Sequence, residues 1–252
     1  MNHMTTNIAT NIATNNITNK TVNKTIKTAF IALSLVASQA QAGAERDPLL
    51  TYFLMDTFEI NNENGNPTSW DATAWVGKDW NKLYLKTEGE NVNGQIESEN
   101  QLLYSRPIKR FWDVQMGLAY DTTPDNTQTW GAIGLQGLAP YFFETNAVLL
   151  ANSDNIGFRF DTEYEALITQ KWILTPSLAF DVYSADDAKM GLGSGLSSSQ
   201  AELRLRYEFT RKFAPYIGVT HNHTYGKKAD YTKAETGSVS ETSWVAGLRF
   251  WF

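Results

Sequence analysis

The sequence predicts an all-β protein, a transmembrane antiparallel outer-membrane β-barrel of about 12 strands with short periplasmic turns and long extracellular loops. Three observations lead to this class. Apolar and polar residues alternate in segment after segment, and short and long polar connections alternate between these segments. Aromatic residues also gather at the ends of the segments that the short connections join, where a membrane barrel carries an interfacial girdle.

The alternation is clearest in the stretches IGFRFDTEYEALI and QAELRLRYEF. Successive side chains of a strand point to opposite faces, so each stretch has one apolar face and one polar face. Charged residues occupy the polar faces of both stretches: Arg159, Asp161, Glu163, Glu165, Glu202, Arg204, Arg206 and Glu208. We therefore predict that the apolar faces contact lipid and that these charged residues line the barrel interior.

Two further segments make specific predictions. Pro176 lies inside the alternating stretch KWILTPSLAFDVY, and because proline has no N–H to donate we expect a bulge or a local break there. In the final stretch SWVAGLRFWF, every second residue from Trp244 to Phe252 is apolar, which predicts a lipid-facing last strand. Phe252 would lie at the periplasmic rim, and a terminal aromatic residue resembles the signal read by the barrel-assembly machinery of Gram-negative bacteria.

The connections between segments alternate in length. Tight links are expected at KDWNK, SRPIKRF, LAPYF, TQKW and TRKFAP. Longer loops are expected at NNENGNPTS, GENVNG, TTPDNTQ, NSDN, SADDAKMGLGSGLSSS and YGKKADYTKAETGSVS. This layout is typical of barrels whose short turns face the periplasm. The girdle expected at the short-turn end comprises Trp80, Phe111, Trp112, Tyr141, Phe142, Trp172, Phe213 and Phe252.

The first 42 residues predict a signal peptide that is cleaved after Ala42. They contain three lysines and no acidic residue, and the apolar run AFIALSLVA precedes the small-residue pattern of residues 40–42. That run is much shorter than the roughly 20 apolar residues of a membrane-spanning helix. We therefore assign residues 1–42 to the signal peptide and residues 43–252 to the barrel domain.

Composition excludes several classes of function. The chain has 21 basic and 27 acidic residues, and removal of the three signal lysines leaves a net charge of about −9. Nucleic acid is therefore not an expected partner. The chain has no cysteine, which excludes disulfides, a thiolate nucleophile and cysteine-based metal sites.

A charged barrel interior has two interpretations. Opposite charges on neighbouring strands can pair and fill the lumen, because an unpaired buried charge is very costly. Alternatively, the charges can line a path for an ion or a small solute. We favour pairing, because about twelve strands enclose little free space once long side chains project inward.

His221 and His223 are the histidines of the predicted mature chain, and they lie two residues apart in GVTHNHTY. That spacing places both imidazoles on one face of a strand, where they can bind a soft divalent ion. They can equally be interfacial polar aromatics where the strand leaves the outer leaflet. A Ser–His lipid hydrolase is conceivable with Ser240 or Ser243, but no serine has a diagnostic spacing, and we predict no enzyme activity.

Four stretches, LYSRPIKRFWDVQMGL, GLQGLAPYFFETNA, SGLSSSQAELRLRYEFTRKFAPYIGV and SWVAGLRFWF, resemble the copper resistance protein B family. The resemblance runs through essentially the whole predicted mature chain. It implies an outer-membrane barrel in contact with lipid that helps bacteria survive excess copper. It also implies partners in the periplasm, namely copper-resistance proteins such as a multicopper oxidase.

The resemblance also implies copper ions as ligands. Family members often carry a Met- and His-rich segment between signal peptide and barrel, where this chain has GAERDPLL. Reduced copper prefers thioether and imidazole donors, so the candidate metal site is His221 and His223 with Met190 from a neighbouring loop, near the extracellular rim. Two hypotheses follow: the protein binds or passes copper, or it is a structural scaffold or narrow general porin whose partners supply copper protection.

Overall fold

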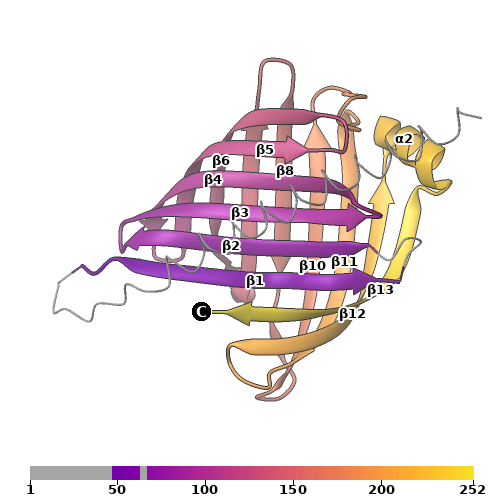
Figure 1. Cartoon of the computed structure of the whole chain (residues 1–252). Coiled ribbons are helices and arrows are strands. Elements are labelled where there is room, and N and C mark those ends of the chain that lie inside the picture. Colours follow the sequence, from indigo (N-terminus) through magenta and orange to yellow (C-terminus); the bar gives the residue numbers. More distant parts are fainter. Residues whose placement is uncertain (1–46, 63–66) are drawn as a thin grey trace, which may run out of the picture. The chain divides into compact units, whose positions relative to one another are not determined.

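The chain folds as a closed antiparallel barrel of 12 strands (Figure 1), as the sequence predicts. The computed structural model describes residues 47–62 and 67–252, so the predicted signal peptide of residues 1–42 lies outside the described residues. No helix among the described residues is long and apolar enough to cross a bilayer. The strands at the front of the barrel cross those behind at a steep angle, as strongly tilted barrel strands do.

The barrel follows chain order, and each strand pairs with the next. The elements are β1 (Leu50–Asn61), β2 (Thr68–Lys78), β3 (Asn81–Val92), β4 (Gln95–Lys109), β5 (Trp112–Thr122), β6 (Thr127–Ala139), η1 (Pro140–Phe142), β7 (Phe143–Ala151), β8 (Ile156–Glu163), β9 (Ala166–Leu167), β10 (Trp172–Tyr183), β11 (Gly195–Tyr207), β12 (Phe213–Thr224), α2 (Gly226–Thr236) and β13 (Ser240–Trp251). The last strand, β13, pairs with β1 and closes the barrel, and Phe53 and Phe252 exchange two backbone hydrogen bonds of 3.0 Å at the seam.

The break expected at Pro176 occurs in the neighbouring strand, whereas β10 itself runs unbroken through the proline and stays paired with β11. Strands β8 and β9 both pair with β10 and are two parts of one barrel strand, interrupted opposite the proline. Pro176 has no N–H to donate to the ladder on this side. Its carbonyl oxygen still accepts a hydrogen bond from the N–H of Tyr164, with an N···O distance of 3.1 Å. Pairing resumes in the same register, from Ser177 opposite Glu163 to Leu174 opposite Ala166, so no residue is inserted.

The two faces of the wall are inverted relative to a water-soluble protein. Large apolar side chains are exposed on the outer face, among them Leu83, Leu102, Met116, Leu118, Ile133, Leu149, Leu203, Ile217 and Trp244. Buried polar and charged side chains face inward, among them Glu59, Ser105, Gln115, Asp121, Arg159, Thr175, Arg206, Thr220 and Ser243. This distribution is the one expected when lipid surrounds the wall.

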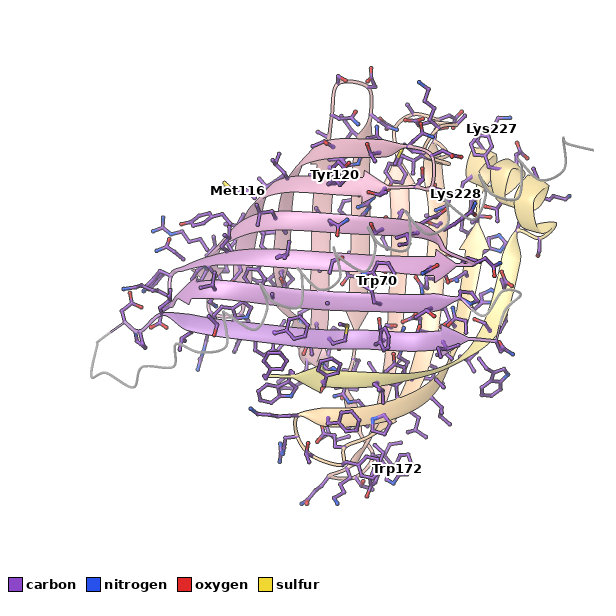
Figure 2. The ribbon with its side chains drawn as sticks, in the orientation of Figure 1. Trp70, Met116, Tyr120, Trp172, Lys227 and Lys228 are labelled. Atoms are coloured by element: carbon purple, nitrogen blue, oxygen red, sulfur yellow. The ribbon has the colours of Figure 1, made fainter. Side chains whose placement is uncertain are left out.

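The aromatic girdle is also present at the short-turn end. Seven of its predicted members are exposed: Trp80, Phe111, Tyr141, Phe142, Trp172, Phe213 and Phe252. Trp112 is half-buried. Figure 2 shows Trp172 at this end and Lys227 and Lys228, at the start of α2, at the other. The two rims therefore differ in chemistry, with aromatic residues at one and charged loops at the other.

An apolar cluster packs inside one side of the barrel. Its members are Tyr84, Leu103, Ala119, Trp130, Ala132, Val148, Leu150, Tyr183 and Leu192. Tyr183 lies across Gly157 of β8, where an added Cβ would come within 2.8 Å of the tyrosine ring. The ring therefore occupies the space that a side chain at position 157 would need. Leu192 belongs to the β10–β11 connection, which therefore folds into the barrel mouth.

The loop prediction is wrong for three of the six connections at the far end. Asn93 and Gly94 alone join β3 to β4, with φ of 53° and 89°, which is the positive φ at both central residues that a type I′ hairpin requires. Residues 123–126 and 152–155 form turns of four residues each. The stretches GENVNG, TTPDNTQ and NSDN are therefore turns and strand ends, and of the connections at this end that the structure describes throughout, the long ones are residues 184–194 and 225–239.

The second of these loops contains a helix that the alternation did not predict. This helix, α2, precedes β13. Its C-cap is Gly237, which has a φ of 81° and whose N–H donates a hydrogen bond to the Lys233 carbonyl. The helix is attached to the neighbouring strand through Lys228, whose Nζ donates to Ser198 Oγ at 3.3 Å. The loop is thus ordered against β11 at the outer rim.

Candidate functional site

An arginine bridge spans the outer half of the lumen. Arg159 projects from β8, is 8% exposed, and donates from Nη2 to Asp121 Oδ2 at 2.7 Å on β5. Its Nη1 lies 2.7 Å from Glu99 Oε2 on β4, and Nη2 also donates to Tyr183 Oη at 3.0 Å. Trp130 Nε1 completes the group with a 2.8 Å hydrogen bond to Asp121. One guanidinium therefore ties β8 and β10 to β4 and β5 across the interior.

A second network crosses the inner half. Arg249 on β13 reaches Glu165, between β8 and β9, at 2.9 Å, and also pairs with Asp56 of β1. Arg206 pairs with the same Glu165. Each of these arginines is held by a carboxylate on a distant strand, so the inner half of the lumen is also braced by ion pairs.

Arg204 extends this network towards β1. Its Nη2 lies 3.2 Å from Glu59 Oε1, and its Nη1 pairs with Glu202 of the same strand. Tyr216 Oη donates to Glu59 at 2.8 Å. To reach Glu59, Tyr216 lies across Gly247, where an added Cβ would meet the tyrosine oxygen at 2.5 Å. The glycine of the last strand is therefore required for this close approach.

A third, weaker link lies between the two arginine networks. Lys86 Nζ on β3 donates to Asn146 Oδ1 on β7 at 3.4 Å, and Asn146 Nδ2 donates to Asp161 Oδ1 at 2.9 Å. The interior is therefore crossed by polar bridges at three places, and the paired interpretation of the lumen charges is confirmed for these residues. Of the residues predicted to line the lumen, Arg159, Asp161, Glu165, Glu202, Arg204 and Arg206 all take part.

The two histidines lie on the outer face of the wall. His221 is opposite Thr242 and His223 is opposite Ser240 in the β12–β13 ladder. The rings share the face of exposed Ile217, whereas the intervening positions of β12 face the lumen. His221 Nδ1 lies 2.7 Å from Thr242 Oγ1. The His223 ring packs against Tyr225 with centroids 4.5 Å apart. The structure therefore brings both imidazoles to one face at the outer rim.

Met190 lies elsewhere. It belongs to the β10–β11 connection and packs against the apolar cluster inside the barrel mouth, on the opposite side of the wall from the histidines. The loop that carries it is held by aspartates: the N–H of Lys189 donates to Asp187 Oδ1 at 2.9 Å, and the N–H of Ser194 donates to Asp186 Oδ1 at 2.6 Å. The bond from Ser194 lowers the pKa of the Asp186 carboxyl.

The geometry can also be compared with two other chemistries, metal coordination by several side chains and hydrolysis by a Ser–His pair. No group of three or more His, Asp or Glu side chains in the described part of the chain is arranged to hold a metal ion. The Ser–His pair of the hydrolase alternative is Ser240 Oγ and His221 Nε2, 3.5 Å apart. The other ring nitrogen faces a threonine hydroxyl, whereas hydrolytic triads place a carboxylate or amide there. The arrangement therefore does not favour hydrolysis.

An apolar outer band, an aromatic rim and a charged interior around twelve closed strands define an outer-membrane β-barrel protein. Solved structures share this architecture. The KdgM porin matches 80% of this chain and 98% of its own at 9% identity with a TM-score of 0.50. The NanC porin matches 80% of this chain and 99% of its own at 13% identity with a TM-score of 0.52. At these identities, the likeness shows the fold and no more.

The family is shown by sequence. Residues 49–252 match the family described as Copper resistance protein B precursor (CopB). Copper resistance protein B of Escherichia coli is 40% identical over 216 residues, which is 84% of this chain and 73% of the relative. A Copper resistance protein B homolog of Pseudomonas syringae pv. tomato is 40% identical over 205 residues, 80% of this chain and 70% of the relative. The chain belongs to the copper resistance protein B family and is located in the outer membrane.

Proposed function

We propose that this barrel acts on copper ions directly at the outer membrane, by binding or passing them, and so contributes to copper resistance and homeostasis. Copper is here the cargo of the protein. The observation that carries the proposal is family membership across the whole barrel, from residue 49 to residue 252. The barrel in turn presents two imidazoles on one face of a single strand at its outer rim.

The histidine pair has suitable chemistry for a first copper contact. Residues two apart on a strand lie about 6.6 Å apart, a distance that two rotatable imidazoles can span around one ion. The Thr242 and Ser240 hydroxyls stand beside His221 on the neighbouring strand. Imidazole suits both copper oxidation states, and oxygen donors suit Cu(II). Met190, at the barrel mouth, is a separate thioether donor for Cu(I) on the same side of the membrane.

The test is copper titration of the purified barrel, with Cu(I) and Cu(II) measured separately. We expect the His221→Ala/His223→Ala variant to bind copper more weakly and to lower copper tolerance in cells that depend on the protein. The matched control is Asn222→Ala, which changes the exposed residue between the two histidines and should leave binding unchanged. A double variant that binds copper as tightly as the parent contradicts the rim site.

A second candidate function is that of a structural scaffold or narrow general porin, with copper protection supplied by periplasmic partners such as a multicopper oxidase. The sparse donor set favours it, because the predicted mature chain has only three methionines, Met55, Met116 and Met190, besides the two histidines. Met116 is exposed on the outer, lipid-facing wall (Figure 2). A parent barrel that binds no copper, in cells whose copper tolerance still depends on it, supports this second function.

A further inference from the structure

Four carboxylates inside the barrel are exposed to solvent although they point away from the outer surface. They are Glu97 on β4, Glu88 on β3, Asp161 on β8 and Glu144 on β7. Each shares the inward face of its strand with a buried residue: Leu103, Tyr84, Arg159 and Val148 respectively. An inward side chain that solvent reaches marks a hydrated space within the lumen.

These carboxylates follow one another from rim to rim. Glu97 is the third residue of β4 after the tight turn at the outer rim, and Glu88 lies within the outer half of β3. Asp161 lies midway along the strand formed by β8 and β9. Glu144 is the second residue of β7 after the inner turn. The hydrated positions therefore occur at successive depths rather than in one group.

The inner half adds a second kind of observation. Thr175 is 6% exposed and lines a cavity of about 20 Å³ together with two carboxylates, Asp56 and Glu163, Tyr216 and three arginines, Arg204, Arg206 and Arg249. Its Oγ1 has no hydrogen-bond partner in the structure. A cavity of this size holds about one water molecule. A buried, unpartnered oxygen in a small cavity lined by groups of both charges is suited to a water molecule.

The lumen is acidic beyond what its arginines neutralise. In the bridges described above, four arginines pair with six carboxylates: Asp56, Glu59, Glu99, Asp121, Glu165 and Glu202. Asp71 and Asp181 are further inward-facing carboxyl groups within electrostatic reach of Glu88. A wall of low dielectric constant concentrates the field of such charges along the lumen. The field attracts cations and repels anions.

The bridges limit the size of what can pass. The Arg159 group spans from β8 to β4 and β5, and the link from Lys86 to Asn146 spans from β3 to β7. These side chains cross the lumen and narrow it. An organic solute would have to displace buried ion pairs, whereas a small ion would not.

We propose that the lumen is a narrow aqueous path for small inorganic cations, in which Glu97, Glu88, Asp161 and Glu144 favour cations over anions. This inference rests on the proposed function, in which the barrel passes copper ions. It takes the lumen as the route and widens the substrate class from copper to simple inorganic cations. Exchange of weakly held ions between successive sites is the usual basis of conduction through a selective pore.

The test is current through the full mature protein, purified from outer membranes and inserted into planar lipid bilayers under a potassium chloride gradient. We expect a small conductance whose reversal potential is shifted towards that of potassium. The Glu88→Gln/Asp161→Asn variant should lose potassium-over-chloride preference severalfold. Asp154→Asn, the same type of change in the exposed β7–β8 turn, is the control and should retain the parent's preference.

If the double variant does not fold, Glu144→Gln provides the same comparison at the inner rim. The proposal is overturned by a folded parent that carries no current, by current that favours chloride or neither ion, or by variants that match the parent. Copper titration of the same preparations separates the two ideas. A cation-selective barrel that binds and passes no copper refutes only the proposed function, and a copper-binding barrel without current refutes only the path.

Discussion

The arginine bridge in the outer half of the lumen provides a stability prediction. Arg159→Met keeps much of the side-chain length but removes the charge that Asp121 and Glu99 now share. Removing one partner of a buried ion pair costs about 3–5 kcal/mol, because the other charge stays buried without compensation. Glu99 has a side chain that is 40% exposed, and a pair so accessible to water contributes only about 0–1 kcal/mol.

The expected loss therefore depends mainly on Asp121, which is 6% exposed and keeps its hydrogen bond from Trp130. We place the loss at the lower end of the range, about 3 kcal/mol in the free energy of unfolding. Arg159→Lys keeps the charge and loses the forked geometry, so it should cost less. Arg159→Met with Asp121→Asn should recover most of the loss, because the only charge left without its partner is then that of Glu99, which is accessible to water.

The assay is equilibrium urea unfolding of the barrel refolded in lipid vesicles, followed by tryptophan fluorescence. Trp130 is fully buried and touches the bridge, so it reports directly on this region. A loss below about 1 kcal/mol for Arg159→Met, which is the range of an exposed pair, refutes the view that the bridge supports the barrel. A double variant less stable than the single variant contradicts the uncompensated-charge explanation.

Two further predictions concern the membrane face. Cysteines placed at Phe158 and Phe160 should react slowly with a water-soluble thiol reagent, and one placed at Lys227 in the loop should react quickly; equal rates would mean that the outward assignment is wrong. Deleting Phe252 or making it polar should reduce outer-membrane insertion more than the roughly 1.5–3 kcal/mol of one lost side chain's burial, if the barrel-assembly machinery recognises this residue as we expect. An unchanged amount of heat-modifiable barrel in outer-membrane fractions contradicts this second prediction.

Alternation along single strands was sufficient to predict which residues face the lumen. It correctly placed Arg159 and Arg206 inside, because the two-residue period of a strand is a local property. It did not identify their partners. Arg159 pairs with Asp121, 38 residues earlier in the chain, and that match depends on the stagger of the whole closed sheet. Asp121 does lie on the polar face of its strand, so the candidate partners were recognisable but the pairing was not.

The loops were predicted less well, for physical reasons that particular residues show. Asn93 and Gly94 are a strong signal for a two-residue hairpin turn. The loop prediction used only the polarity of the stretch and therefore missed this signal. Met190 and Leu192 are apolar residues in an otherwise polar loop, and burying them draws the loop into the barrel mouth. The neighbouring positions of the two loops in the predicted barrel suggested that Met190 would join the histidines. The wall of the barrel, which separates an inner from an outer face, places them on opposite sides.

The charge imbalance of the lumen bears on why the interior is built from ions at all. If the arginines served only to fill space and brace the strands, one carboxylate for each would satisfy them, and replacement by apolar residues would often be no less stable. Arg204 instead contacts both Glu59 and Glu202, and Arg159 contacts both Asp121 and Glu99. Each of these two bridges thus retains one negative charge after pairing, whereas Arg206 and Arg249 balance Glu165 and Asp56. In the proposed cation path, water and mobile cations neutralise the remainder, which ties the structural role of the bridges to that path.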